Sequence, residues 1–251
     1  MHPFAISLLV FVCTFGAALL GMFLRRVLPE HHLAPESREV VRVAMGLVAS
    51  TVALILGLLV YSSKGFYDTQ TAEVTQLSAN VVLLDRLLAH YGPEAAEARA
   101  ELRRSIGRQL DVMWAENNSH DPGTQARAPS GEAILERIDE LAPKDDRQKA
   151  FQAQARSLAF QMGQTRLLMY EQRSVPVPKP LMVILIFWLF ALFVSFGLFA
   201  PSNMTVAVSL CIAALAVCGA IYLIVEMYYP YGGLIQVSSA PLKAALAQLG
   251  Q

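Results

Sequence analysis

Four long apolar stretches dominate the pattern of hydrophobic and polar positions along this chain of 251 residues. None of them contains Asp, Glu, Lys, Arg or His. Each is about 20 residues long, and a helix of that length spans roughly 30 Å, the thickness of a bilayer's hydrocarbon core. The pattern predicts an all-α membrane protein with four transmembrane helices, at Phe4–Leu24, Val43–Ser63, Leu181–Ala200 and Met204–Val225.

The spacing of these stretches predicts two helical hairpins with a helical soluble insert between spans two and three. A short polar linker separates the first two spans, and an even shorter one separates the last two. We therefore divide the chain into a first transmembrane hairpin (1–64), a helical soluble domain (65–179), a second transmembrane hairpin (180–227), and a C-terminal interfacial segment ending in a short amphipathic helix (228–251).

Within the insert, apolar residues recur at alternating intervals of three and four, which is typical of packed helices. We expect the first and last helices of the insert to pair as a stalk that continues spans two and three. A connector at Val175–Pro180 leads into span three. The first stripe is Val74, Leu77, Val81, Leu84, Leu88 and Tyr91, and the last is Phe151, Ala155, Leu158, Met162, Thr165 and Met169.

Shorter helices are expected between these two and at the C-terminus. One, at about Glu94–Glu116, follows the helix-breaking Gly92-Pro93. The next begins after the turn-rich loop Asn117–Gly131, with Ser130 as its N-cap. In the C-terminal helix, Ser239 suits the N-cap, Pro241 the first turn and Gly250 the end. Its apolar face is Leu242, Ala245, Leu246 and Leu249.

Composition agrees with a membrane protein and narrows its partners. The chain is 55% hydrophobic with a mean hydropathy of +0.43, values that soluble domains rarely reach. Its net charge is zero, so no basic field suggests nucleic acid. Residues 64–179 carry 15 Lys and Arg against 16 Asp and Glu, which is typical of a solvated helical surface. The expected surroundings are therefore a lipid bilayer.

Enzyme motifs are missing from the sequence. There is no P-loop, no glycine-rich dinucleotide turn, no HExxH and no GxSxG. All three cysteines lie in apolar stretches, and the adjacent His31 and His32 are interpreted as part of a solvated linker. We expect no catalytic residue, no cofactor and no metal site.

Small residues line one face of span two. Gly46, Ser50, Ala53 and Gly57 recur at intervals of four, three and four. Spacing alone favours close helix packing, because small residues let helix backbones approach in lipid. The functional interpretation is a pore face, with Leu54 and Leu58 as bulky neighbours that could form an apolar gate. Span four has a similar stripe, interpreted as packing, at Ser209, Ala213, Ala216 and Ala220.

Glu226 is the carboxylate that adjoins an apolar span, at the end of span four. A partly desolvated carboxylate needs a partner or a raised pKa. We consider three roles for it: a group facing a permeation vestibule, a partner of Lys64 or Arg42 in an ion pair, or an ordinary interfacial residue.

The charges that flank the spans do not fix the orientation. Four basic residues lie in the first linker and four lie near the span ends on the other side. Because Arg25 and Arg26 follow the first span directly, the positive-inside rule leans weakly towards an external insert.

Two segments resemble a family of bacterial multi-pass membrane proteins that is known by a domain of unknown function and described as bestrophin-like. One is Val81–Glu94, with Asp85, Arg86, Tyr91, Gly92 and Pro93. The other runs from Glu226 to Leu242, with Ser238, Ser239 and Pro241. Tyr228 departs from the family pattern, which has an acidic residue near this place. For Asp85-Arg86 the sequence allows a subunit-interface salt bridge or a helix-surface pair.

The resemblance implies a function by analogy with the bestrophins, which are pentameric anion channels. It implies a homo-oligomeric, anion-conducting channel of the bacterial inner membrane, with span two lining the pore and the insert in the cytosol. The alternative is a non-conducting membrane scaffold or signalling protein that assembles through its helical insert. Architecture alone does not decide between them.

Overall fold

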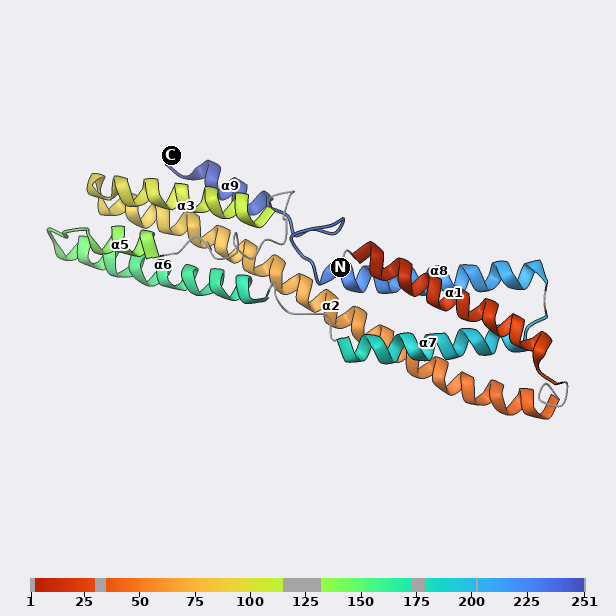
Figure 1. The fold of residues 1–251 in the computed structure, drawn as a ribbon. Helices are drawn as coiled ribbons and strands as arrows, with labels where there is room; N and C mark the ends of the chain where they lie inside the picture. The colour runs from red at the N-terminus through yellow and green to blue at the C-terminus, as the bar shows by residue number, and fades with distance from the viewer. Residues whose placement is uncertain (1–2, 30–34, 115–131, 173–178, 202, 251) are drawn as a thin grey trace. The chain divides into compact units, whose positions relative to one another are not determined.

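The structure is a computed structural model that describes residues 3–29, 35–114, 132–172, 179–201 and 203–250. These residues form helices and no strand, as predicted (Figure 1). The membrane-spanning helices are α1 (Pro3–Val27), α2 (Pro35–Tyr91), α7 (Lys179–Phe199) and α8 (Met204–Met227). The others are the 3₁₀ turn η2 (Pro93–Ala95), α3 (Ala96–Trp114), α5 (Glu132–Asp139), α6 (Asp146–Gln172) and α9 (Ala240–Gln248).

The chain divides into two compact units. The membrane unit comprises residues 1–66 and 176–228, and the soluble unit comprises residues 67–175 and 229–251. Helix α2 belongs to both, because it runs without a break through span two into the first helix of the insert, as its apolar pattern predicted. It begins at Pro35, eight residues before the apolar stretch, where the fixed φ of proline suits a first helical position.

The expected continuation of the insert into span three lies mostly outside the described residues. Helix α6 ends at Gln172 and α7 begins at Lys179. Of the predicted connector at Val175–Pro180, residues 175–178 lie outside the described residues.

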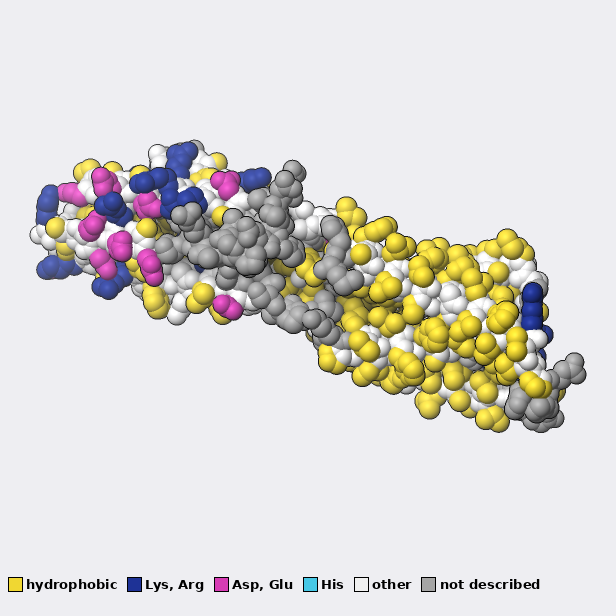
Figure 2. All heavy atoms as spheres, viewed as in Figure 1, with side chains coloured by type: hydrophobic (Ala, Val, Ile, Leu, Met, Phe, Trp, Pro, Cys, Tyr) yellow, Lys and Arg dark blue, Asp and Glu magenta, His cyan; other side chains and the backbone are white. Residues whose placement is uncertain are grey.

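In the membrane unit, α1 packs against α7 and α8. Its buried face carries small and polar side chains at intervals of three and four: Ser7, Val10, Thr14, Ala17, Ala18 and Gly21. The buried hydroxyl of Thr14 donates to the carbonyl oxygen of Val10, 2.9 Å away, so it needs no partner from another helix. On the face that Figure 2 shows, apolar side chains cover most of this unit, as a lipid-facing surface requires.

Two glycines set how closely α1 and α7 approach. A Cβ atom built on Gly21 would lie against the carbonyl oxygen of Val194 and 2.8 Å from the backbone nitrogen of Leu198. One built on Gly197 would lie against the carbonyl oxygen of Ala18. Only glycine fits at this crossing, since backbone atoms of each helix occupy the place of a side chain on the other.

The soluble unit is a helical bundle whose core is formed by the predicted stripes. All six residues of the first stripe are buried, as are Ala155, Leu158, Met162 and Met169 of the last; Phe151 and Thr165 are partly buried. The C-terminal segment belongs to this core. The Trp114 indole donates to the carbonyl oxygen of Val237, 2.8 Å away, and Leu242 of α9 is fully buried.

The predicted N-cap of α9, Ser239, is confirmed in position, but it lacks the side-chain hydrogen bond of a capping serine. Its backbone is already helical (φ −77°, ψ −7°), whereas a capping serine usually has extended dihedrals that direct its oxygen at the first free amides. The Ser238 hydroxyl instead accepts from the amide of Ala240, 3.2 Å away. Gly250, at φ +89°, follows the last turn as expected. The other predicted cap, Ser130, lies outside the described residues.

Candidate functional site

The small-residue face of span two is exposed within the chain. Gly46, Ser50, Ala53 and Gly57 are all exposed on α2. Beyond the helix's own turns, no heavy atom of the described residues lies within 4 Å of the position that a Cβ would take at Gly46 or Gly57. The Ser50 hydroxyl donates to the carbonyl oxygen of Gly46, 3.0 Å away, and so stays on this face. Among the described residues, close packing inside one chain therefore does not explain these positions.

The similar stripe on span four is also open. Ser209, Ala213 and Ala216 are exposed on α8, and Ala220 is partly buried, so the packing role expected for the stripe is wrong for a single chain. The close contact in the membrane unit lies between α1 and α7 instead, at Gly21 and Gly197. Sequence spacing identifies small-residue faces but does not say which of them meets a partner helix.

Basic residues flank the small-residue face of α2 at both ends. Arg42 lies one turn before Gly46, and Lys64 lies two turns after Gly57; both side chains are exposed. Acidic residues follow one turn further out, at Glu39 and Asp68. The charges closest to the small-residue face are therefore positive.

Glu226 lies in the last turn of α8 and is 1% exposed. The side chain of Tyr222, one helical turn earlier, forms a hydrogen bond with it. Contacts between the end of α8 and α2 include the Ser63 hydroxyl, 3.6 Å from the Met227 sulfur, and the hydroxyls of Ser62 and Tyr228, which are 3.4 Å apart. The Glu226 carboxylate is thus buried near the end of span two that carries Lys64.

Arg42 cannot pair with Glu226 of the same chain. Ser63 lies beside Met227, whereas Arg42 lies 21 residues earlier on the continuous helix α2. At about 1.5 Å rise per residue this separation is roughly 30 Å, several times the length of an arginine side chain. Of the two cations proposed from the sequence, Lys64 is the one at the same end of the unit as Glu226.

Asp85 pairs with Arg99 and not with its neighbour Arg86. The Asp85 carboxylate accepts from Arg99 Nε at 2.7 Å and from Nη2 at 2.8 Å. Asp85 is buried, and Arg86 is exposed. Adjacent residues on a helix point in different directions, so the sequence pair does not form a structural pair. Hydrogen bonding to Asp85 raises the pKa of Arg99, and the bidentate contact joins α2 to α3.

The remaining motif residues lie at turns and helix ends of the soluble unit. Gly92 has φ +132°, which strongly favours glycine, and its carbonyl accepts from the amide of Ala95 at 3.2 Å, so that Pro93 starts η2. The carbonyl of the buried Tyr91 accepts from Gln148 of α6, 3.1 Å away. Ser238 accepts a hydrogen bond at the start of α9, as described above, and Pro241 lies in the first turn of that helix. Packing and turn geometry account for these positions.

A polar network that the apolar stripes did not reveal surrounds Gln70, which is fully buried on α2. Its amide nitrogen donates to Glu73 at 3.2 Å and also to Gln172 of α6, while its oxygen accepts from the Tyr231 hydroxyl at 2.7 Å. Gln172 donates in turn to Glu73 at 3.2 Å. Burial raises the pKa of Glu73, and these two amide hydrogen bonds partly oppose the rise.

Arg166 of α6 is a second polar group that sequence reasoning missed. Its Nη1 donates to the Ser105 hydroxyl of α3, 3.1 Å away, while Nε and Nη2 are shielded from solvent and find no hydrogen-bond partner among the described residues. A signal was present in the spacing. Between Met162 and Met169 the stripe admits either Thr165 or Arg166, since both fit intervals of three and four. The predicted stripe has Thr165 at this place.

Comparisons with known proteins agree with this architecture. The model of the Bestrophin-like domain matches residues 12–242. Two variants of a bacterial bestrophin homologue from Klebsiella pneumoniae have similar crystal structures, at TM-scores of 0.64 and 0.62 and identities of 14% and 15%. The alignments cover 99% and 98% of this chain and 96% and 99% of those chains. At such identities the likeness concerns the fold. No curated protein matches the sequence.

Proposed function

Because the chain belongs to the Bestrophin-like domain family, we propose that it forms a homo-oligomeric ion channel in which the small-residue face of α2 lines the ion pathway. The observation that carries this proposal is the exposure of Gly46, Ser50, Ala53 and Gly57 on a membrane-spanning helix. Small side chains leave room along a pore axis, and the exposed Leu54 and Leu58 are suited to an apolar constriction that opens by wetting.

Anions are the proposed permeant ions. Arg42 and Lys64 are the charged residues nearest to the two ends of the face. In an oligomer Arg42 would be repeated around the axis, and a ring of basic side chains concentrates anions at a pore mouth. The resemblance to bestrophins points the same way.

Glu226 has a supporting role in this proposal. Because Glu226 is buried, its carboxylate is not expected to face a water-filled vestibule within a single chain. We assign it to an ion pair with Lys64, which would hold the end of α8 against α2, in line with the contacts of Ser63 with Met227 and Ser62 with Tyr228. By the same family analogy, the protein lies in the bacterial inner membrane with the soluble unit in the cytosol.

The test is the current carried by purified protein in planar bilayers. We expect channel openings whose reversal potential in a chloride gradient follows the chloride equilibrium potential. Ser50→Trp, which places a large ring on the small-residue face, should lower the unitary current. Leu9→Trp is the matched control, because Leu9 is exposed on α1 and not on this face. Folded oligomers that carry no current at any voltage or salt concentration would refute the proposal.

A second candidate function, a non-conducting scaffold, is supported by exposed apolar side chains in the soluble unit. Phe160, Leu167 and Leu168 of α6 are 58%, 61% and 55% exposed. Such side chains on a soluble helix suit contact with a protein. Silent bilayers together with one stoichiometric partner that is lost on Phe160→Ser would favour the scaffold over the channel.

A further inference from the structure

The C-terminal loop, Pro230–Val237, lies between α8 and α9 in the soluble unit and is closed on itself. The Val237 amide donates to the Pro230 carbonyl oxygen, 2.7 Å away, and so joins the two ends of the loop. Within it, the side-chain amide of Gln236 donates to the carbonyl oxygen of Gly233 at 2.8 Å. Gly233 has φ +90°, a conformation that favours glycine. These contacts give the loop a defined shape.

The C-terminal loop is fastened along α2 at two points. At its base, the buried Tyr231 donates to Gln70 at 2.7 Å. Nearer its tip, the carbonyl oxygen of Gln236 accepts from the hydroxyl of Tyr67, 3.2 Å away. Tyr67 precedes Gln70 by three residues on α2, and side chains on a helix lean towards its N-terminus, which is the side of span two. The loop therefore extends from its base towards the end of span two.

The C-terminal loop also begins close to the ends of two spans. Tyr67 follows Ser63, the last residue of the second apolar stretch, by four residues on the unbroken α2, which is roughly 6 Å. Pro230 follows Met227, the last residue of α8, by three. Since the headgroup layer on each side of the hydrocarbon core is about 5–8 Å thick, the attachment at Tyr67 lies at the depth of the lipid headgroups.

The tip of the C-terminal loop exposes a leucine. Leu234 is 84% exposed, the highest value among the large hydrophobic side chains that the structure describes. No residue from Met227 to Leu242 is charged, so no charge opposes the entry of this segment into the interface with lipid. Tyr229, which is exposed just before the loop, is of a residue type favoured at that interface.

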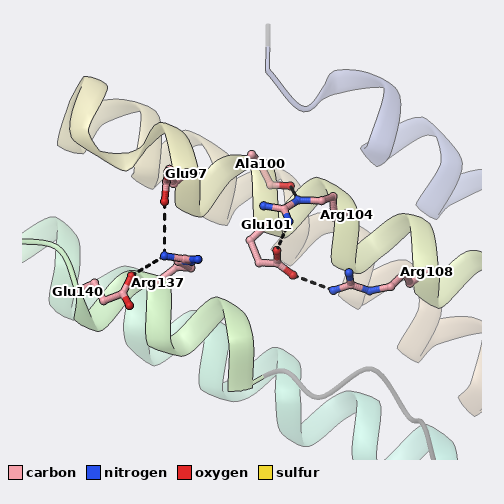
Figure 3. Close-up of polar contacts among 7 residues, drawn as sticks. All are labelled: Glu97, Ala100, Glu101, Arg104, Arg108, Arg137 and Glu140. Carbon is pink, nitrogen blue, oxygen red and sulfur yellow. Dashed lines mark hydrogen bonds and ion pairs between the residues drawn. The ribbon is translucent and has the colours of Figure 1, made fainter.

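Another part of the soluble unit's surface carries paired charges instead. On α3, Glu101 accepts from Arg108 at 2.7 Å and pairs with Arg104 at 3.1 Å (Figure 3). Arg137 of α5 pairs with Glu97 of α3 at 3.4 Å. Exposed ion pairs of this kind are typical of a surface in water. The uncharged C-terminal loop has the composition of a surface that meets lipid.

We propose that the C-terminal loop inserts Leu234 into the lipid headgroup layer, in the leaflet where span two ends, and so attaches the base of the soluble unit to the bilayer. The contact covers an apolar side chain and needs no anionic lipid. It is independent of the proposed ion pathway and applies whether or not the protein conducts. A second copy of the chain is the other candidate for covering Leu234, and the experiment separates the two.

Fluorescence of the full-length protein in phosphatidylcholine nanodiscs tests the insertion. With the three cysteines replaced by alanine, Leu234→Cys is labelled with an environment-sensitive fluorophore. Lipid that carries a spin label near its headgroup should quench this label, and iodide in the water should not. Leu83→Cys is the matched control, because Leu83 is 47% exposed on α2 and lies sixteen residues beyond Tyr67, roughly 24 Å farther from span two. Its label should be quenched by iodide and not by the spin-labelled lipid.

If the background without cysteine does not fold, Leu234→Trp and Leu83→Trp in the natural sequence supply the comparison, with brominated lipid as the quencher. Leu234→Trp should add lipid-dependent quenching to the signal of Trp114 and Trp188, and Leu83→Trp should add none. Iodide quenching at Leu234 equal to that at Leu83 would overturn the proposal. So would a label at Leu234 that is shielded from iodide but untouched by the lipid quencher, since that result would assign the loop to contact with a second copy.

Discussion

Replacing Gly21 by alanine should destabilise the membrane unit by wedging α1 away from α7. The added Cβ would lie against the Val194 carbonyl oxygen and 2.8 Å from the Leu198 nitrogen. Because non-bonded heavy atoms are most stable at about 3.5–4.0 Å, the second contact alone requires a shift of roughly 0.7 Å. A gap of 0.5–1 Å forfeits about a quarter to a half of the dispersion energy of the contacts that it opens.

Overpacking of this kind costs about 1–3 kcal/mol, and contact with rigid backbone places Gly21→Ala in the upper part, at about 2–3 kcal/mol. At roughly 2–4 °C per kcal/mol for a chain of this size, the Tm should fall by about 4–12 °C. The assay is thermal unfolding of the purified protein in detergent. Gly16→Ala and Gly219→Ala are the controls, because both glycines are exposed helical positions where a Cβ meets nothing within 4 Å.

The difference between Gly21→Ala and the two controls isolates the steric effect, since all three changes bring the same gain in helix propensity, about 1 kcal/mol. The controls should unfold at the wild-type Tm or slightly above it. A Tm for Gly21→Ala within 1–2 °C of the controls, roughly the shift that 0.5 kcal/mol gives, would refute the close crossing of α1 and α7.

Two further predictions concern the soluble unit. Asp85→Asn should lower the free energy of unfolding by about 1–2 kcal/mol, because Arg99 loses a charged bidentate partner but keeps some exposure to water. Arg86→Gln should change the free energy of unfolding by nearly nothing. Equal losses for the two variants would contradict the pairing of Asp85 with Arg99. Burial raises the pKa of Glu73, so the folded chain binds that proton more tightly than the unfolded chain, and the stability this contributes is present in acid and lost as the pH rises through the folded pKa. The Tm of wild type should therefore rise relative to that of Glu73→Gln as the pH falls from neutral towards about 4.3, and a difference that does not change with pH would contradict this.

The spans and the helical stripes could be predicted because they depend only on the order of apolar and polar residues along the chain. A run of about 20 apolar residues without charge is typical of a transmembrane helix. Apolar residues at intervals of three and four mark one face of a helix. The continuity of α2 followed from the same reasoning, since no proline separates Ser63 from Val74 and a helix tolerates the isolated Gly65.

The contacts between helices could not be predicted in this way. Gly21 and Gly46 are both glycines in apolar spans. Gly21 lies at a close helix crossing and Gly46 does not, because the backbone of α7 passes beside Gly21. Asp85 finds Arg99 fourteen residues away across a helix–helix interface, while its sequence neighbour points elsewhere. Arg166 and Thr165 fit the stripe equally well by spacing, and only the position of Ser105 shows which of them meets a polar partner.

Cysteine accessibility during current recording tests the proposed ion pathway most directly. In a background without Cys13, Cys211 and Cys218, single cysteines would replace Ser50, which is exposed, and Val52, which lies two residues away on the buried side of α2 and is 4% exposed. A charged, membrane-impermeant thiol reagent should change the current through the Ser50→Cys channel and leave Val52→Cys unaffected. Current that persists unchanged while Ser50→Cys stays unmodified would contradict a pore lined by the small-residue face of α2.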